Sequence, residues 1–427
     1  MKIKKPRIYY IILFFLMILD LEFLNLVDTA RFNILGVYYS DIIFIVCILV
    51  VVAELIRCGL RINMDASLVI IILFLTIACF SAKSAQLSYN QSFLAGIAAQ
   101  REWLSWIILI IPVYRWVKQN KITREGIQTC IRYTSRCYVL ICIVQYFLYN
   151  YVKFTYVMTN SRYGSVRLYF NTAYFSIAIC IILDELFNKK ITRRQKTLDL
   201  IELVAYFFAV AFITKGRMAT IALVASMAIF FSVRKNISLG KKLLVIMCAI
   251  IGVVIFTYTT MGQDILNTIT GVSSNTDTLS VRDAAKAYYI GKTMSSSRTL
   301  FWGYGVPNIH SKTAMAITNP LWKDMGDARF YLNDVGIVGI LFEYGVFGVS
   351  LLIGLTIFMI IKYFSLYRKQ GKTQYLQYLV LDIITWASLT PTLFSTSILG
   401  VILLTVAFVK ETCDISTENR DTVESNI

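Results

Sequence analysis

Repeated apolar segments constrain the fold of this chain more than any other feature. Runs of about 17–25 apolar residues match the length of a helix that crosses a hydrocarbon core of about 30 Å. A transmembrane β-barrel would show alternating segments of roughly ten residues instead, and the sequence lacks them. Only 16% of the residues are charged and 57% are hydrophobic, whereas about a quarter of a soluble domain is charged. The sequence therefore predicts an all-α polytopic membrane protein.

The apolar lengths predict about twelve transmembrane helices. The first run carries Asp20 and Glu22 and lacks a clear small-x-small cleavage site, so we interpret it as a span rather than a signal peptide. Pro391 separates the last two runs and favours a tight reversal, because proline removes a donor and restricts the residue before it. The spans are expected near residues 8–28, 40–56, 67–82, 102–117, 137–152, 170–187, 198–213, 218–233, 243–260, 335–361, 375–390 and 393–409.

One long polar interval divides these spans. Residues 1–260 are expected to hold helices one to nine, 261–334 a large extracytoplasmic loop, 335–410 helices ten to twelve, and 411–427 a polar cytoplasmic tail. With the N-terminus inside, the inner segments carry 27 of the 42 basic residues, the short outer loops 8 and the long loop 7. Lysine and arginine concentrate on the cytoplasmic side of membrane proteins. Both termini are therefore expected in the cytoplasm.

Composition also narrows the function. The net charge of +17 is interpreted as a topology signal and an attraction to anionic lipid headgroups, and no basic amphipathic motif points to nucleic acid. The nine cysteines lie mostly inside apolar runs and form no CxxC pair, so neither disulfides nor a metal site are expected. No GxxxxGK[ST] motif supports nucleotide hydrolysis, and no cofactor is expected.

Basic residues on the predicted outer side run against the topology pattern and therefore point to a function. Arg167 lies just before a span, and Lys215 and Arg217 occupy a minimal turn, Thr214-Lys-Gly-Arg. Arginine offers a planar fork of donors that matches phosphate oxygens, so we expect several of these cations to bind a lipid-linked diphosphate. The alternative is pairing with acidic neighbours or headgroups. The outer candidates include Arg101, Arg162, Arg167, Lys215, Arg217, Arg282, Arg298 and Arg329.

Two residues of the polar interval are candidates for proton transfer. His310 is the only histidine of the chain, and histidine suits proton transfer near neutral pH; the alternative is an ordinary surface residue. Asp334 lies where the chain re-enters the bilayer and is able to accept a proton from a hydroxyl, or to cap the following helix. Sugar stacking or plain packing are the two interpretations of the nearby aromatic rings, which are Trp302, Tyr304 and Trp322.

Three short motifs, together with the span pattern, resemble one known family. They are Thr214-Lys-Gly-Arg, Phe301-Trp-Gly-Tyr-Gly, and Asn333-Asp-Val-Gly-Ile-Val-Gly followed by Glu343-x-Gly345-x-x-Gly348. The chain is similar to O-antigen and capsular polysaccharide repeat-unit polymerases and to the related O-antigen ligases. Ligases of this superfamily typically carry His-Asn at the end of the loop, where this chain has Leu332-Asn333-Asp334.

The resemblance implies a metal-independent glycosyltransferase of the bacterial cytoplasmic membrane, with a fold like that of the C-superfamily integral-membrane glycosyltransferases. Its donor and acceptor would be undecaprenyl-diphosphate-linked oligosaccharides. A chain-length regulator and a flippase are further implied partners, besides membrane lipids. Arg217 would act in catalysis, with Asp334 as first choice of base and His310 as second. The remaining cations would bind the substrate: Arg162, Arg167, Lys215, Arg298 and Arg329.

Three other functions stay open at this point. A ligase would transfer a finished glycan to a different acceptor. A transporter or flippase of lipid-linked sugars would more typically show repeats and charges at the bilayer midplane, whereas the unusual charges here gather on one predicted face. A purely structural membrane protein is the simplest alternative.

Overall fold

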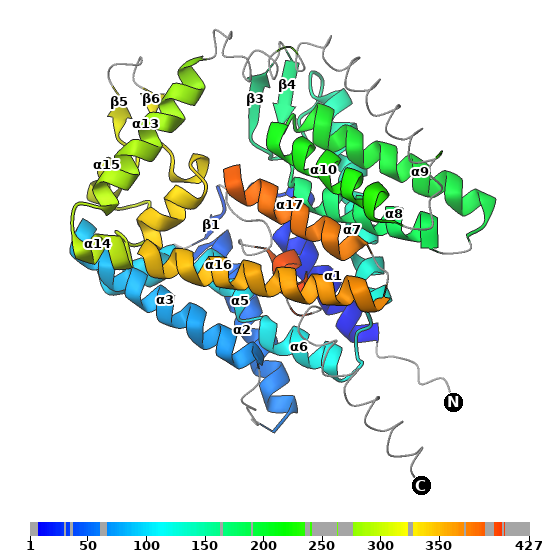
Figure 1. Ribbon diagram of the computed structural model, residues 1–427, viewed down its shortest axis with the longest axis horizontal. Helices are drawn as coiled ribbons and strands as arrows, with labels where there is room; N and C mark the ends of the chain where they lie inside the picture. The colour runs from blue at the N-terminus through cyan, green and yellow to red at the C-terminus, as the bar shows by residue number, and fades with distance from the viewer. Residues whose placement is uncertain are drawn as a thin grey trace.

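The fold is predominantly helical, as the apolar segments predict (Figure 1). In the part of the chain that the structure describes, three short antiparallel strand pairs accompany the helices. The computed structural model describes residues 7–29, 31–34, 37–59, 66–162, 165–188, 191–234, 240, 263, 276–322, 328–370, 373–388, 397–403 and 405. The predicted span at 243–260, the reversal at Pro391 and the tail 411–427 lie outside these residues.

Three of the described helices are long and apolar enough to cross a membrane. They are α2 (Tyr39–Arg57), most of α3 (Ala66–Tyr89) and most of α16 (Ile337–Gln370). A fourth span results if the pair Phe93–Ala99 and Arg101–Lys118, bent by 64°, is counted as one. This finding supports a helical membrane protein, and the count of about twelve spans stays a prediction.

The remaining helices are shorter, or carry more charge, than a simple apolar span. Two of them, α1 and α10, are short apolar helices. The bounds of all these remaining helices are α1 (Arg7–Asp20), η1 (Phe23–Asn25), α4 (Phe93–Ala99), α5 (Arg101–Ile107), α6 (Ile110–Lys118), α7 (Arg124–Leu148), α8 (Thr172–Asn188), α9 (Arg193–Phe208), the π-helix η2 (Ala209–Ile213), α10 (Arg217–Val233), α13 (Thr276–Thr293), α14 (Ser297–Trp302), α15 (Lys312–Thr318), η4 (Leu332–Asp334) and α17 (Gln374–Ser388). The strands are β1 (Asn33–Ile34), β2 (Val37–Tyr38), β3 (Thr159–Arg162), β4 (Ser165–Leu168), β5 (Leu321–Trp322) and β6 (Ala328–Arg329).

Several helix ends differ from the expected spans. The first helix ends at Asp20, because Glu22 to Asn25 adopt left-handed backbone angles with φ between 51° and 62°. Helix α7 begins well before residue 137, since the Thr123 hydroxyl caps its first turn by accepting from the Gly126 amide at 3.3 Å. Apolar length therefore locates helices better than it locates their ends.

The polar interval 261–334 contains helices and a hairpin in its described part. Helices α13, α14 and α15 lie on the left in Figure 1, with β5 and β6 beside them and α3 and the start of α16 below. Tyr289, Phe330 and Phe342 are buried together, so this part has a small core that includes α16.

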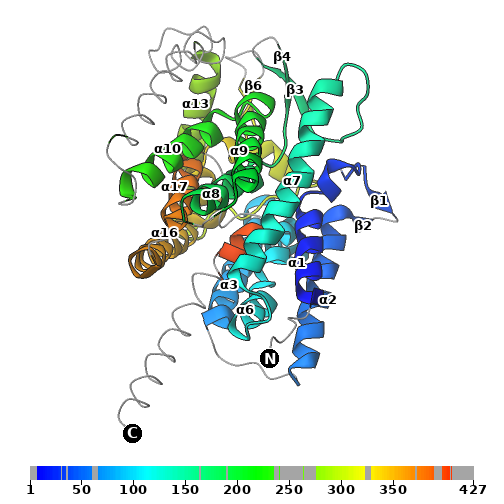
Figure 2. The ribbon, with the colours of Figure 1, turned by 90° about the vertical axis from the view of Figure 1, so that its right-hand side faces the viewer.

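The main core lies mostly among the helices before this interval, and residues of α16, α17 and the segment 397–403 also belong to it. Large side chains fill it without solvent exposure, including Trp116, Tyr138, Tyr174 and Phe175. Figure 2 shows α1 beside α7, with α2 on the other side of α1. The Tyr39 hydroxyl donates to the Leu19 carbonyl at 2.6 Å and joins α2 to the end of α1.

Long-range contacts join segments that are expected on the same side of the membrane. On the predicted outer side, Tyr156 N donates to Asn25 O, Arg167 Nε to Thr214 O, and Asn308 N to Gln91 Oε1, at 2.8, 2.7 and 3.1 Å. On the predicted inner side, Thr123 N donates to Tyr10 Oη, Arg132 Nη2 to Asp199 Oδ1, and Gln128 Nε2 to Gln374 Oε1, at 2.9, 2.7 and 3.2 Å. These contacts agree with predicted spans that run alternately outward and inward across the membrane. Which side faces the cytoplasm stays a prediction.

Candidate functional site

The glycine-rich segment after α14 is held against a break in α16. Gly345 has φ 64° and ψ −167°, so the helix is interrupted there. A break of this kind leaves carbonyls of the preceding turn without helical partners. The Phe342 carbonyl accepts from Tyr304 N at 2.7 Å, and the Glu343 carbonyl accepts from Gly305 N at 3.0 Å.

Helix α3 binds the other side of the same segment. The Gly305 carbonyl accepts from the Tyr89 hydroxyl at 3.2 Å, and Val306 N donates to the Ser81 hydroxyl at 3.1 Å. The Ser84 hydroxyl donates to the Gly303 carbonyl. The segment is therefore fixed between two of the candidate membrane spans.

Glycine is required at three points of this arrangement. Gly303, Gly305 and Gly345 all have positive φ, between 64° and 86°. A Cβ on Gly345 would lie 2.4 Å from the Phe301 carbonyl oxygen, and one on Gly303 would lie 2.6 Å from the Glu343 carbonyl carbon. The Phe-Trp-Gly-Tyr-Gly and Glu-x-Gly-x-x-Gly motifs are thus two halves of one packed unit.

The aromatic rings of this unit pack against other rings. Trp302 stacks on Phe80 with a centroid distance of 4.3 Å and contacts Phe347 at 4.6 Å. Tyr304 stacks on Phe342 at 4.7 Å with an interplanar angle of 5°. These contacts favour the packing interpretation of both rings. The side chain of Trp322 lies outside the described residues.

Asp334 is the last residue of η4. Helix α16 begins three residues later, at Ile337, so Asp334 is not its N-cap and the capping alternative is wrong. Its carboxylate lies 4.0 Å from Arg282 Nη2 of α13, with side-chain exposures of 48% and 44%. The carboxylate is therefore accessible to solvent.

His310 lies apart from Asp334, next to β2. Its exposed ring stacks on Tyr38 with a centroid distance of 5.7 Å. The Arg101 guanidinium lies 5.6 Å from the centre of the Tyr38 ring and pairs with the Asp41 carboxylate at 3.1 Å. Among the residues that the structure describes, no hydrogen bond or ion pair joins His310 to Asp334. The two proton-transfer candidates thus belong to separate clusters.

Arg167 reaches the Thr214-Lys-Gly-Arg turn. It lies on β4, paired with Asn160 of β3. Its Nε donates to the Thr214 carbonyl at 2.7 Å, and its Nη1 donates to the Tyr169 hydroxyl at 2.9 Å. The guanidinium also lies 4.0 Å from the centre of the Tyr169 ring. Thr214 directly follows η2, so its carbonyl is at a helix end, where it can accept from a side chain.

The turn continues from this contact into α10. Lys215 is buried and has φ 47°, and Arg217 is the first residue of α10. Arg167 and Arg217 therefore belong to adjacent backbone segments, as convergence of the two cations requires. The side chains of Arg162 and Arg217 lie outside the described residues, although the backbone of both is described.

The two remaining cations have different surroundings. Arg298 of α14 donates to the hydroxyls of Ser84 and Ser88 on α3, both at 3.1 Å. Among the residues that the structure describes, its polar partners are these neutral serine groups rather than a carboxylate. Arg329 is exposed on β6, opposite Leu321.

The candidates therefore form separate groups on the side that the sequence predicts to be outside. Arg282 lies on α13, Arg298 on α14 and Arg329 on β6, all on the left in Figure 1, and Asp334 pairs with Arg282. Arg167 belongs to the hairpin β3–β4, next to α10. His310 lies with Tyr38 and Arg101, as described above. The chain matches no protein-family model, and no curated protein matches it.

Sequence reasoning missed two polar clusters inside the helical body. Arg132 of α7 pairs with Asp199 at 2.7 Å and Glu202 at 2.9 Å on α9, and also contacts Glu185 of α8. The signal was present, because residues 199 and 202 are three apart and share a helix face. Asp20 accepts from the Tyr174 hydroxyl at 2.8 Å and the Ser397 hydroxyl at 3.0 Å, and nothing local in the sequence indicates those partners.

Proposed function

We propose that this protein polymerises undecaprenyl-diphosphate-linked oligosaccharide repeat units on the outer face of a bacterial cytoplasmic membrane. About twelve spans would carry the site, with both termini in the cytoplasm. The observation that supports the proposal best is the contact between Arg167 and the carbonyl of Thr214, three residues before Arg217. It joins two basic segments where the positive-inside pattern disfavours positive charge.

The proposed reaction transfers a glycan from one lipid diphosphate to the end of another glycan. An acceptor hydroxyl attacks the anomeric carbon of the donor, a new glycosidic bond forms, and the bond between that carbon and the diphosphate oxygen breaks. The electron pair of the broken bond leaves with the lipid diphosphate. Arg167 and Arg217 would offset the charge that develops there, and fixed cations in a site of low dielectric are effective in that role.

Asp334 is the proposed base. It would take the proton that the acceptor hydroxyl loses, and its exposed position before α16 favours access to a sugar. Arg282 lies 4.0 Å from the carboxylate. The reaction requires Asp334 and the two arginines to contact the same donor–acceptor pair, because the attacked carbon is bonded to the diphosphate.

The deletion phenotype distinguishes the proposed polymerase from the alternatives. Surface glycan separated on a gel should show single repeat units in place of a ladder when the gene is deleted. Complete chains left on the lipid carrier would indicate a ligase instead. Accumulation of lipid-linked single units on the cytoplasmic face would indicate a flippase.

Single substitutions then test the site in cells that lack the native gene. Arg167→Ala and Arg217→Ala should each reduce chain extension by about 10²–10³-fold, the usual effect of losing one group that stabilises transition-state charge. Arg31→Ala is the matched control, because Arg31 is also on the predicted outer side but is 89% exposed and pairs with Asp28 at 3.4 Å. Normal polymer length in both site variants, at normal protein levels in the membrane, would refute the assignment.

A further inference from the structure

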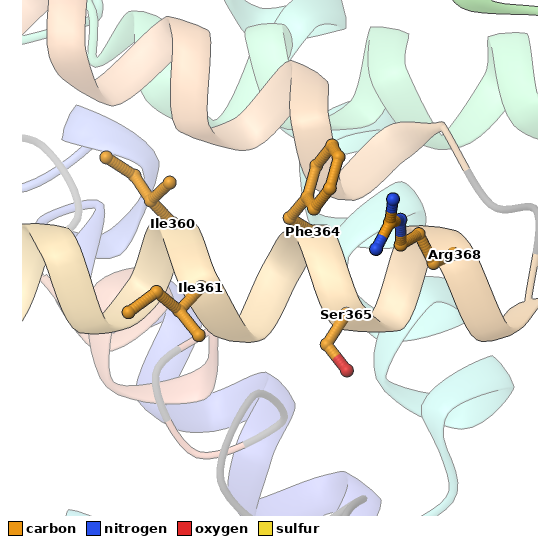
Figure 3. Close-up of a pocket in the computed structure, with 5 residues that line it drawn as sticks. All are labelled: Ile360, Ile361, Phe364, Ser365 and Arg368. Atoms are coloured by element: carbon orange, nitrogen blue, oxygen red, sulfur yellow. The ribbon is translucent and has the colours of Figure 1, made fainter.

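An open groove lies on the surface of α16, away from the glycine-rich unit. Its volume is about 510 Å³. Figure 3 shows Ile360, Phe364 and Arg368 along one edge and Ile361 and Ser365 along the other. Ile361 is 61% exposed and Phe364 is 46% exposed, so the groove opens outward from the helix.

The groove lies at the end of α16 opposite to the candidate site. The break in α16 at Gly345 lies against Phe301 of α14 and Gly303, and in Figure 1 the C-terminal end of α16 lies on the other side of the molecule from α14. There the Tyr367 hydroxyl donates to the Val233 carbonyl at the end of α10, at 3.4 Å. Lysine and arginine follow both helix ends in the sequence. By the positive-inside pattern, this is the cytoplasmic side.

The lining of the groove changes from apolar to cationic along the helix. Isoleucine and phenylalanine side chains line the part nearer the middle of the span, and Ser365 and Arg368 line the part nearer its end. The Arg368 guanidinium lies 5.2 Å from the centre of the Phe364 ring, so it is held at the groove rather than extended away from it. None of the five lining residues is acidic.

We propose that this groove binds one anionic phospholipid of the inner leaflet. An acyl chain would lie along Ile360, Ile361 and Phe364, and the phosphate would contact Arg368 and Ser365. The charge of the groove carries the choice of ligand, because a guanidinium fork matches phosphate oxygens and basic pockets on the cytoplasmic side attract anionic headgroups. The proposal does not depend on the polymerase activity.

Equilibrium lipid binding to the purified full-length protein tests the headgroup contact. Native mass spectrometry would count bound phosphatidylglycerol and, separately, phosphatidylcholine with the same acyl chains. Arg368→Ala should weaken phosphatidylglycerol binding about fivefold, the effect of one basic residue near an anionic surface, and weaken phosphatidylcholine binding less, because the cationic choline offsets the charge of the phosphate that the guanidinium contacts. Arg194→Ala is the matched control, because Arg194 is an exposed cation near the start of α9, also on the predicted inner side.

A second pair of variants tests the apolar part. Ile361→Trp should fill the groove and lower phosphatidylglycerol binding, whereas Ile357→Trp, exposed one turn earlier on α16 and outside the lining, should not. Helical circular dichroism and elution volume report on the fold of each variant.

Three results would overturn the proposal. The first is equal binding of the two phospholipids, or an equal loss in Arg368→Ala and Arg194→Ala. The second is an Arg368-dependent preference for undecaprenyl phosphate over phosphatidylglycerol, which would make the lipid carrier the occupant. The third is a dimer that Ile361→Trp converts to a monomer without any effect of lipid, which would make a second copy of the chain the occupant.

Discussion

The Arg167 guanidinium is fixed before any substrate arrives. A backbone carbonyl at 2.7 Å, a tyrosine hydroxyl at 2.9 Å and an aromatic ring at 4.0 Å all contact it. Immobilising a flexible side chain on binding costs about 0.5–1.5 kcal/mol, and a side chain that is already held avoids most of that cost. Lysine in this position would lose the planar fork that makes these contacts possible.

The Asp334 carboxylate gives the sharpest prediction for a single residue. Asp334→Asn keeps the size of the side chain but removes the ability to accept a proton, so chain extension should fall by about 10²–10⁴-fold. The measurement is the length distribution of surface glycan, together with the rate of polymer formation by the purified protein. Binding of the lipid-linked donor should change little, because the proposed cations remain in place.

A nearby carboxylate supplies the control for this substitution. Asp283 is exposed on the same helix as Arg282 and pairs with Lys286 at 3.0 Å. Asp283→Asn should leave polymer length unchanged. If Asp334→Asn retains full activity while His310→Ala loses it, the base lies in the cluster of His310 and Tyr38 instead.

The broken helix α16 shows how one element shapes the side that is predicted to be outside. An uninterrupted helix would use the Phe342 and Glu343 carbonyls internally, but the break at Gly345 makes them available to Tyr304 and Gly305. The polar interval is thereby attached to the same helix that follows Asp334. The position of Asp334 therefore depends on the glycine-rich unit, although no residue of that unit is proposed to react.

Substitution of Gly345 tests this dependence. Gly345→Ala should destabilise the protein by at least about 1–3 kcal/mol, the cost of a side chain held in a sparsely populated backbone region, because its Cβ would also meet the Phe301 carbonyl. Thermal unfolding in detergent, followed by tryptophan fluorescence, measures the loss. Gly354→Ala, in the same helix, meets no atom within 4 Å and should leave the midpoint unchanged or slightly higher. Equal midpoints for both variants would contradict the role of the break.

The same element shows how far the sequence predicts the fold and the site. Apolar length predicts α16 because burial in lipid depends on local composition, and the outer arginines stand out because they oppose a local charge rule. The pairing of residues 303–305 with residues 342–345, by contrast, depends on contacts between distant segments. The sequence likewise does not indicate the serine contacts of Arg298 or the left-handed backbone after Asp20. The convergence of Arg167 on the turn at Thr214 was a hypothesis that only the structure could examine.

At the scale of the whole molecule, the same-side contacts restrict the topology without fixing its direction. Hydrogen bonds join outer segments to outer segments and inner segments to inner ones. Such a pattern arises when helices alternate in direction across a layer. Inverting the whole molecule would leave every contact intact, so the direction depends on the 27 basic residues assigned to the inner side.

Labelling of single cysteines decides which side of the molecule faces the cytoplasm. In a variant without the nine native cysteines, Lys312→Cys on α15 should react with a membrane-impermeant maleimide in intact cells whose outer barrier has been removed. Arg194→Cys should react only after the membrane is permeabilised. Both positions are exposed, so accessibility within the fold is matched and the bilayer alone separates them. The reverse result would place Asp334, Arg167 and the turn at Thr214 on the cytoplasmic side. Polymerisation on the outer face would then be impossible, and a cytoplasmic step on the same lipid carrier would take its place.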